Sequence, residues 1–248
     1  MRTTSHARSA HQVPTVLLTG FEPFGGDARN PSGDAVLEVA RSWSGPERLV
    51  TAVLPVAFEA ARTQVRALLA KHRPELVLAV GVAGGRDALS PERVAVNLMD
   101  ARIPDNAGAR PLDEPVVAGG PAAHFATVPV KAIAQALREA GLPAAVSHTA
   151  GTFVCNHVFY VAAHEASVLN EDHARAGNGT ETRGQVRVGF LHVPWSAESV
   201  PAGDDDTTSA LRRTALPAAD LARAVSLAVR TALDVREDLS DSSAGTLH

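Results

Sequence analysis

The chain has 248 residues, 45% of them hydrophobic, and a formal net charge of −4. It is long enough to bury a large core, and its composition is typical of a globular protein. It has no basic cluster and no run of about 18 apolar residues, so we expect neither a nucleic-acid partner nor a membrane-spanning segment. The only cysteine, Cys155, excludes an intramolecular disulfide and a cysteine-rich zinc site.

The first segment, residues 1–13, lacks the apolar run of a signal peptide and is predicted to form a disordered leader. We therefore expect a cytoplasmic location, where a lone thiol stays reduced.

Strand-like and helix-like segments alternate after this leader. Short β-branched and apolar runs that end near glycine or proline predict strands at 15–20, 49–56, 75–85, 144–151 and 186–195. Apolar residues at helical spacing predict helices at 33–43 (capped near Ser32), 57–73, 129–141, 155–169 and 217–235. Polar stretches at 171–184 and 203–208 are expected to be surface loops, and residues 236–248 a flexible tail. The alternation favours a single α/β domain with a twisted, mostly parallel sheet and helices on both faces.

Two glycine-rich loops follow predicted strands. "TGFEPFGG" spans 19–26 and "GVAGGR" spans 81–86, and both lie at the carboxyl ends of strands, where α/β proteins gather their sites. Neither loop matches a dinucleotide-binding or phosphate-loop pattern, so no nucleotide site is expected. We expect both loops to converge with the loop before Cys155 at one edge of the sheet.

Cys155 stands at the start of a predicted helix, after the loop residues "AGT". The dipole and free amide groups of a helix N-terminus stabilise a thiolate, and the same amides can donate to the oxyanion formed in acyl transfer. The alternative interpretation is that Cys155 is a small buried hydrophobic residue. Position alone leaves both interpretations open.

A nucleophilic thiol needs a base, and the chain has ten histidines. His192 is favoured because it lies near the carboxyl end of an apolar strand that Pro194 closes. His148, at a strand end before the cysteine loop, stays open as an alternative. His157 is two residues from Cys155 along a helix, which rotates it by roughly 200° away. His124 is placed in a loop without a strand to hold it.

An acid should orient the imidazole, and Glu92 follows the glycine turn after the 75–85 strand. Its rivals are three aspartates of the next loop, Asp100, Asp105 and Asp113. The structural alternative is a capping role for Glu92, with Arg93 or Arg102 as its surface partner. No metal site is expected, because no two histidines show H-x-x-x-H spacing with a third ligand.

Four segments together resemble a known family. "VLLTGFEPFGGDARNPS", "VGVAGGR…ERVAVNLMDARIPDN", "AGTFVCNHVFY" and "GFLHVPW" are similar, in the same order, to the sequence blocks of pyroglutamyl peptidase I. The resemblance covers residues 14–235, which we therefore expect to form the α/β domain. It implies a cysteine peptidase that removes an N-terminal pyroglutamyl residue from peptides through a thioester acyl-enzyme, without metal or organic cofactor.

The resemblance also implies roles for individual residues. The family's nucleophile, base and acid match Cys155, His192 and Glu92; further site residues match Arg102 and Asp105; and the pocket for the pyroglutamyl ring matches Phe21, Phe24, Phe153 and Val154. The family commonly forms homo-tetramers, so a homo-oligomer is expected.

One position departs from the family, which often has glutamine where this chain has Val82. A side-chain hydrogen bond to the substrate is then missing, which favours as the alternative function a catalytically inactive relative that binds pyroglutamate-like ligands. A nucleoside-phosphorylase-like enzyme would need a phosphate loop, and the sequence has none.

Overall fold

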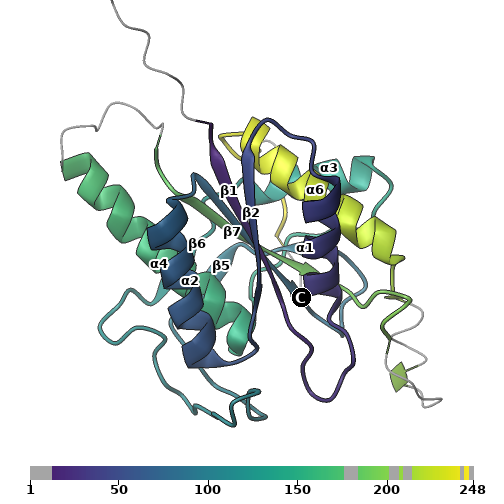
Figure 1. The fold of residues 1–248 in the computed structure, drawn as a ribbon, viewed down its shortest axis with the longest axis horizontal. Helices are drawn as coiled ribbons and strands as arrows, with labels where there is room; N and C mark the ends of the chain where they lie inside the picture. The colour runs from purple at the N-terminus through teal and green to yellow at the C-terminus, as the bar shows by residue number, and fades with distance from the viewer. Residues whose placement is uncertain (1–12, 176–183, 201–206, 209–213, 241–242, 246–248) are drawn as a thin grey trace, which may run out of the picture.

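The chain forms a twisted sheet with helices on both faces (Figure 1). The computed structural model describes residues 13–175, 184–200, 207–208, 214–240 and 243–245. Its strands are β1 (Thr15–Phe21), β2 (Arg48–Leu54), β3 (Leu76–Val82), β4 (Ser90–Pro91), β5 (Val94–Val96), β6 (Ala123–Phe125) and β7 (Arg187–Val193). Its helices are α1 (Pro31–Ser42), α2 (Phe58–His72), α3 (Val130–Glu139), α4 (Val154–His173) and α6 (Ala218–Asp234).

The main sheet has the strand order β2-β1-β3-β7-β4. The pairs β1–β2, β1–β3 and β3–β7 are parallel, and only the short β4 runs antiparallel, to β7. Parallel strands have their carboxyl ends at the same edge of the sheet, so β1, β3 and β7 end there side by side, at Phe21, Val82 and Val193. The predicted sheet, mostly parallel within one α/β fold, is confirmed.

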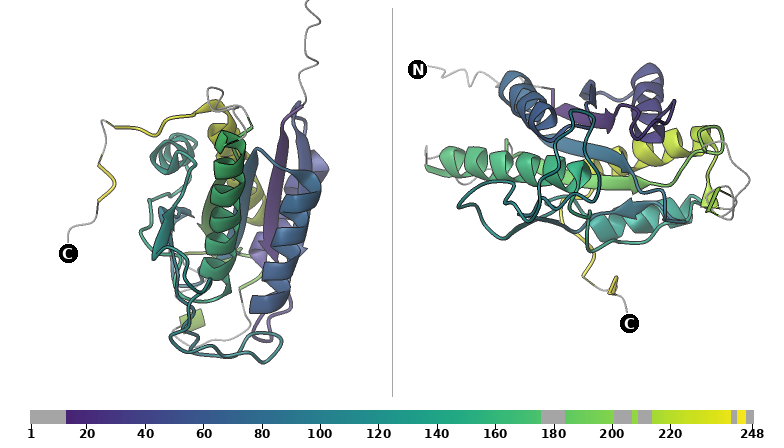
Figure 2. Two further views of the ribbon diagram at one scale, coloured as in Figure 1. Left: turned by 90° about the vertical axis from the view of Figure 1, so that its left-hand side faces the viewer. Right: turned by 90° about the horizontal axis from the view of Figure 1, so that it is seen from below.

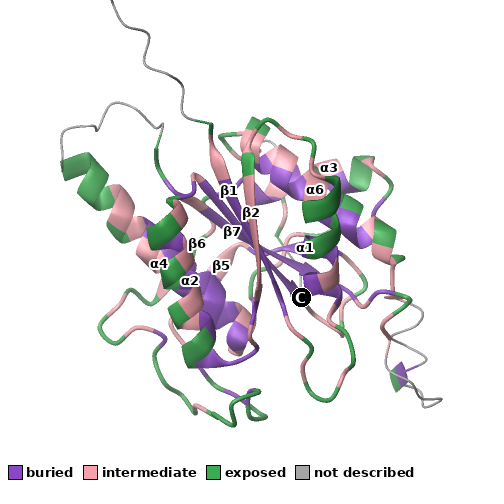
Figure 3. Ribbon diagram, in the orientation of Figure 1, coloured by how far each residue is buried: buried purple, intermediate pink, exposed green. Residues whose placement is uncertain are grey.

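Each face of this sheet has its own apolar core. Leu17 and Phe190 point to the side covered by α2 and α4, whereas Leu18 and Leu191 point to the side covered by α1, α3 and α6. Side chains alternate along a strand, so an apolar run without polar breaks is what a sheet buried on both faces requires. Figure 2 shows the two helix layers, and Figure 3 shows that β1, β3 and β7 between them are largely buried.

The structure corrects several predicted elements. Residues 144–151 are not a strand: Ala144 and Ser147 make only isolated bridges, to Leu89 and Glu92. The expected strandless loop around His124 instead contains β6, which pairs with β5 in a separate two-stranded antiparallel sheet. These pairings join segments far apart in the chain, and local patterns do not encode them.

The helix boundaries also differ from the prediction. The cap of α1 is Asn30, whose Oδ1 accepts the Ser32 amide, while the Ser32 hydroxyl accepts the Phe21 amide at 3.1 Å. Helix α4 runs on to His173, into the predicted 171–184 loop. Most of that loop (176–183), most of 203–208 and the leader up to residue 12 lie outside the described residues. Within the described residues, no helix is both long and apolar enough to cross a membrane.

Candidate active site

A cavity of about 230 Å³ opens at the carboxyl edge of the sheet. It is lined by Phe21, Phe24, Asp27, Arg29, Asn30, Val56, Val82, Gly84, Phe153, Val154, Cys155 and Trp195. Both glycine-rich loops and the loop before α4 contribute to this lining, so the predicted convergence of three loops is confirmed.

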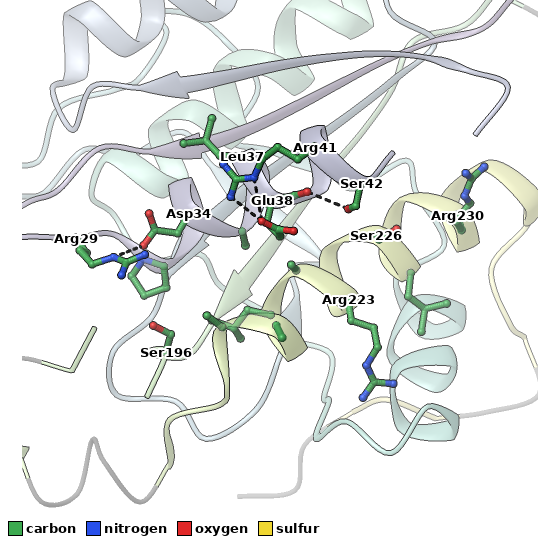
Figure 4. A pocket seen from close by; sticks show the side chains of 17 residues that line it. Arg29, Asp34, Leu37, Glu38, Arg41, Ser42, Ser196, Arg223, Ser226 and Arg230 are labelled. Atoms are coloured by element: carbon green, nitrogen blue, oxygen red, sulfur yellow. Dashed lines mark hydrogen bonds and ion pairs between the residues drawn. The ribbon is translucent and has the colours of Figure 1, made fainter. Parts of the chain in front are cut away.

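A larger hollow of about 1000 Å³ lies on the surface between α1 and α6 (Figure 4). All four of its arginines are held in ion pairs, among them Arg29 with Asp34 at 2.9 Å and Arg41 with Glu38 at 2.6 Å. No cysteine or histidine lines it. Because the smaller cavity holds the thiol, we place the site there.

Aromatic rings form the wall of the smaller cavity. The Phe24 and Phe153 ring centroids lie 5.3 Å apart at an interplanar angle of 48°. Phe58, the first residue of α2, stands edge-on to Phe153 at 5.3 Å, and His157 stands edge-on to Phe58 at 5.4 Å. Phe21 is the last residue of β1 and is buried. The wall therefore has a second aromatic layer behind it, which fixes the position of Phe153.

Cys155 lies in the first turn of α4, where the capping position, Phe153, offers no side-chain hydrogen bond to the free amides. Its Sγ lies 2.8 Å from where a Cβ on Gly81 would stand, so the thiol packs directly on β3. Burial, followed by the negative charge of Glu92, raises the pKa of the Cys155 thiol to about 12, against the opposing effect of Arg86. Burial and the charge of Glu92 thus favour the protonated thiol, opposite to the effect expected from the helix start.

The strand register places His192 beside Gly81, the residue on which this thiol packs. Gly81 pairs with His192 between β3 and β7, and the alternation along β7 puts His192 on the same face as Phe190. Its Nδ1 is 2.7 Å from Glu92 Oε1, and both side chains are buried. An ionised carboxylate only accepts hydrogen bonds, so the Nδ1 hydrogen points to Glu92 and the Nε2 lone pair stays free.

The charge state of His192 follows from its surroundings. Burial lowers the pKa of His192, while the hydrogen bond and charge of Glu92 raise it, and Arg86 lowers it further. Because the lowering effect prevails, the imidazole is neutral near pH 7 and is able to accept a proton.

Glu92 has a second partner, which was not predicted from the sequence. Arg86 Nη1 donates to Glu92 Oε1 at 2.6 Å, so neither Arg93 nor Arg102 is the ion-pair partner. The sequence signal that could have identified this partner is the position of Arg86 at the end of the glycine turn "GVAGGR". Trp195, directly after Pro194 at the end of β7, was also not predicted to line the cavity.

Two residues implied by the family resemblance lie outside the cavity lining. Arg102 is exposed. Asp105 is buried: its Oδ2 accepts the Phe58 amide at 2.8 Å, and its Oδ1 accepts the amides of Ala107 and Ala109. Asp105 therefore holds the start of α2, behind the aromatic wall. The other rivals for the acid, Asp100 and Asp113, are exposed.

The other histidines considered for the base have other partners. His157 Nδ1 lies 3.1 Å from the Met99 sulfur, and burial lowers the pKa of His157 to about 4. His148 Nε2 lies 3.0 Å from the Ala244 carbonyl oxygen. His124 lies 3.2 Å from a ring nitrogen of His164. Among the described residues, no three His, Cys, Asp or Glu side chains are placed to hold a metal ion.

Comparison with known proteins gives one consistent result. The model of the pyroglutamyl peptidase family matches residues 14–235. A pyrrolidone-carboxylate peptidase of Clavibacter michiganensis is 48% identical over 88% of this chain and 97% of that protein. One from Streptomyces coelicolor is 50% identical over 76% of this chain and 81% of that protein.

Solved structures agree with these sequence matches. Pyroglutamyl peptidase I of Bacillus amyloliquefaciens is 37% identical, with a TM-score of 0.76 over 91% of this chain and all of the other. Pyrrolidone carboxyl peptidase from Thermococcus litoralis is 34% identical, with a TM-score of 0.77 over 90% of this chain and 94% of the other.

Proposed function

Because this chain belongs to the pyroglutamyl peptidase family, we propose that it removes the N-terminal pyroglutamyl residue from peptides. Cys155 is the nucleophile, His192 the general base and acid, and Glu92 the group that orients the imidazole. The observation that supports this most directly is the 2.7 Å contact between His192 and buried Glu92, next to the only cysteine of the chain. An imidazole held in one tautomer beside a thiol is the arrangement that thiol acyl transfer requires.

The cavity suits a pyroglutamyl ring. Pyroglutamate is a flat, uncharged lactam, and the tilted rings of Phe24 and Phe153 offer apolar surfaces for such a ring. Arg29 in the lining is already paired with Asp34, so its charge is not available to bind a carboxylate in the slot. Val82 in the lining is apolar and offers no side-chain hydrogen bond, so we propose that main-chain groups bind the lactam oxygen and N–H.

The reaction begins from the neutral pair. As Sγ attacks the pyroglutamyl carbonyl carbon, His192 Nε2 takes the thiol proton, and the uncapped amides of the first turn of α4 stabilise the oxyanion. The C–N bond then breaks, His192 gives its proton to the leaving peptide amine, and a thioester remains. Water, activated by His192, hydrolyses the thioester and releases pyroglutamate. Arg102 is exposed, and we assign no step to it.

The test is the release of a fluorophore from a pyroglutamyl amide under reducing conditions. We expect release by the purified protein, none by Cys155→Ala, and none from the matching prolyl amide, which lacks the lactam oxygen and carries a charged amine. Absence of release by the unaltered protein contradicts the proposal. If calorimetry then shows pyroglutamate binding without turnover, the inactive-relative alternative replaces it.

The cellular location and assembly stay predictions. A cytoplasmic location rests on the sequence, and the homo-tetramer rests on the family resemblance. Light scattering coupled to size-exclusion chromatography measures the second.

A further inference from the structure

Arg86 joins two parts of the site that lie in different loops. Its Nη1 donates to Glu92 Oε1 at 2.6 Å, and its Nη2 donates to the Thr149 carbonyl at 2.9 Å. Thr149 belongs to the short loop that leads into α4 and Cys155. We infer that Arg86 is a positioning residue that locks the imidazole-orienting carboxylate to the nucleophile loop, an inference that rests on the function proposed above.

The first argument is the burial of Glu92. Its side chain is 0% exposed, and Oε1 accepts from both Arg86 and His192, whereas Oε2 has no partner among the described residues. A carboxylate removed from water is stable only when a counter-charge compensates it. The imidazole of His192 is neutral, so Arg86 supplies that charge. Because the Arg86 side chain is 29% exposed, the guanidinium itself stays partly hydrated.

The second argument is the way the nucleophile loop is anchored. The Thr149 carbonyl accepts from Arg86 and from the Ser147 hydroxyl, and the Ser147 carbonyl accepts the Arg93 amide at 2.8 Å. Ser147 also forms the isolated bridge with Glu92. The acid and the loop are therefore adjacent along their backbones, and Arg86 is the side chain that bonds to both.

The third argument is electrostatic. Among the described residues, Glu92 and Arg86 are the charged groups that act on both His192 and Cys155. Arg86 lowers the pKa of each, so its loss leaves an uncompensated negative charge that favours protonation of both groups. A variant without this charge should hold the imidazole proton to higher pH and form less thiolate.

The experiment compares Arg86→Gln with Arg93→Gln, which removes the same charge one residue from Glu92 but from a side chain that lines a different surface cavity. Alkylation of Cys155 by neutral iodoacetamide is followed at pH 8.5, and since the chain has one cysteine, the rate reports this thiol alone. We expect the Arg86→Gln rate to fall about tenfold, because loss of the charge that lowers the thiol pKa leaves less thiolate, and each pKa unit changes the thiolate fraction about tenfold. Arg93→Gln should alkylate as the unaltered protein does.

Hydrolysis of the pyroglutamyl amide gives the second measurement. We expect the acid limb of kcat/KM in Arg86→Gln to move up by about one pH unit and kcat to fall more than KM rises. Arg86→Lys keeps the charge but not the two-pronged geometry, so it should restore the pH profile and only part of kcat. If Arg86→Gln does not fold, Arg86→Lys decides: wild-type kcat in that variant overturns the inference.

The outcomes separate this inference from the proposed function. An alkylation rate and an acid limb in Arg86→Gln equal to those of Arg93→Gln overturn the positioning role, whatever the substrate. If alkylation responds as expected but the unaltered protein hydrolyses no pyroglutamyl amide, the proposed function fails and the positioning role of Arg86 stands.

Discussion

Gly81 is the residue against which the Sγ atom of the proposed nucleophile, Cys155, packs. An alanine Cβ at this position would stand 2.8 Å from Cys155 Sγ and 2.8 Å from Phe190 Cζ, closer than real Cβ contacts. Either the thiol or the phenylalanine ring must then move. Glycine is required here by close packing, because the backbone of Gly81 does not have a positive φ.

We therefore predict that Gly81→Ala lowers kcat by about 100-fold, the effect of misplacing a reacting group by about 1 Å. Thermal unfolding should change much less than the rate does. The control is Gly85→Ala, since a Cβ there meets nothing within 4 Å. Equal kcat values in the two variants would contradict the packing argument.

His157 is the second residue from which a measurable effect is predicted, here on the pH dependence of stability. Its ordinary pKa of 6.5 applies to the unfolded chain, and burial lowers it to about 4 in the folded state. Between these pH values the unfolded chain binds a proton that the folded protein does not. Stability is therefore fully present above about pH 6.5, falls as the pH drops, and has lost about 3 kcal/mol from this group below about pH 4.

Urea unfolding of His157→Gln across this pH range measures the contribution. The variant should be less stable at pH 7, yet it should lose less free energy on acidification than the unaltered protein. His192 shifts in the same direction and remains in both, so only the difference between the two curves is assigned to His157. His148→Gln, at an exposed position, should leave the pH dependence unchanged.

The sequence predicted part of the residue chemistry. Cys155, His192 and Glu92 come from loop and strand-end positions together with the family blocks, and the structure brings all three to one edge of the sheet. Arg86 was not predicted, because the counter-charge of a buried acid depends on how two loops close on each other. The thiol pKa was expected to fall at a helix start, since sequence shows the helix start but not the burial that opposes it.

At the level of elements, helix α2 and the loop 105–109 support the pocket from behind. Asp105 accepts the first amide of α2, which fixes Phe58 against Phe153, and Phe153 in turn faces Phe24. A residue that the family resemblance assigned to the site thus acts one layer behind it in this structure.

We predict that Asp105→Asn raises KM severalfold while kcat changes little. Both carboxylate oxygens accept backbone amides, so an amide NH₂ in place of one oxygen leaves a buried donor facing a donor, which costs about 1–3 kcal/mol of unfolding free energy. Asp113→Asn, the same change at an exposed aspartate, is the matched control. A reduced kcat with unchanged KM in Asp105→Asn would instead indicate a direct role in the chemistry.

Helices and strands with a clear local sequence pattern were predicted correctly, whereas elements that depend on pairing between distant segments were not. β1, β3 and β7 are mostly apolar runs, and α4 shows helical spacing, so each was found. Residues 144–151 have strand-like composition but make only isolated bridges, to Leu89 and Glu92 on either side of the two-residue β4. Composition does not reveal how short the partner segment is.

At the scale of the whole molecule, residues after α6 pack back against the start of α3, one of the helices that cover the sheet. Asp238 Oδ1 accepts the amides of Lys131 and Ala132 at 3.0 Å, and the Leu239 carbonyl accepts from Lys131 Nζ. The start of α3 has no side-chain cap of its own, so Asp238 takes that place. The beginning of the predicted flexible tail, 236–248, is therefore bound, and in this structure the fold extends past residue 235.

This contact distinguishes two truncations that sequence alone would treat alike. Ending the chain after residue 235 removes Asp238 and leaves two amides of α3 uncapped, and we expect a loss of about 1–2 kcal/mol in unfolding free energy. Ending it after residue 240 keeps the cap and should cost less than about 0.5 kcal/mol. Asp238→Ala in the full chain should reproduce the first result, which assigns the loss to the cap rather than to chain length. Urea unfolding at pH 7 measures all three, and equal stability of the two truncations would show that the tail contributes nothing to α3.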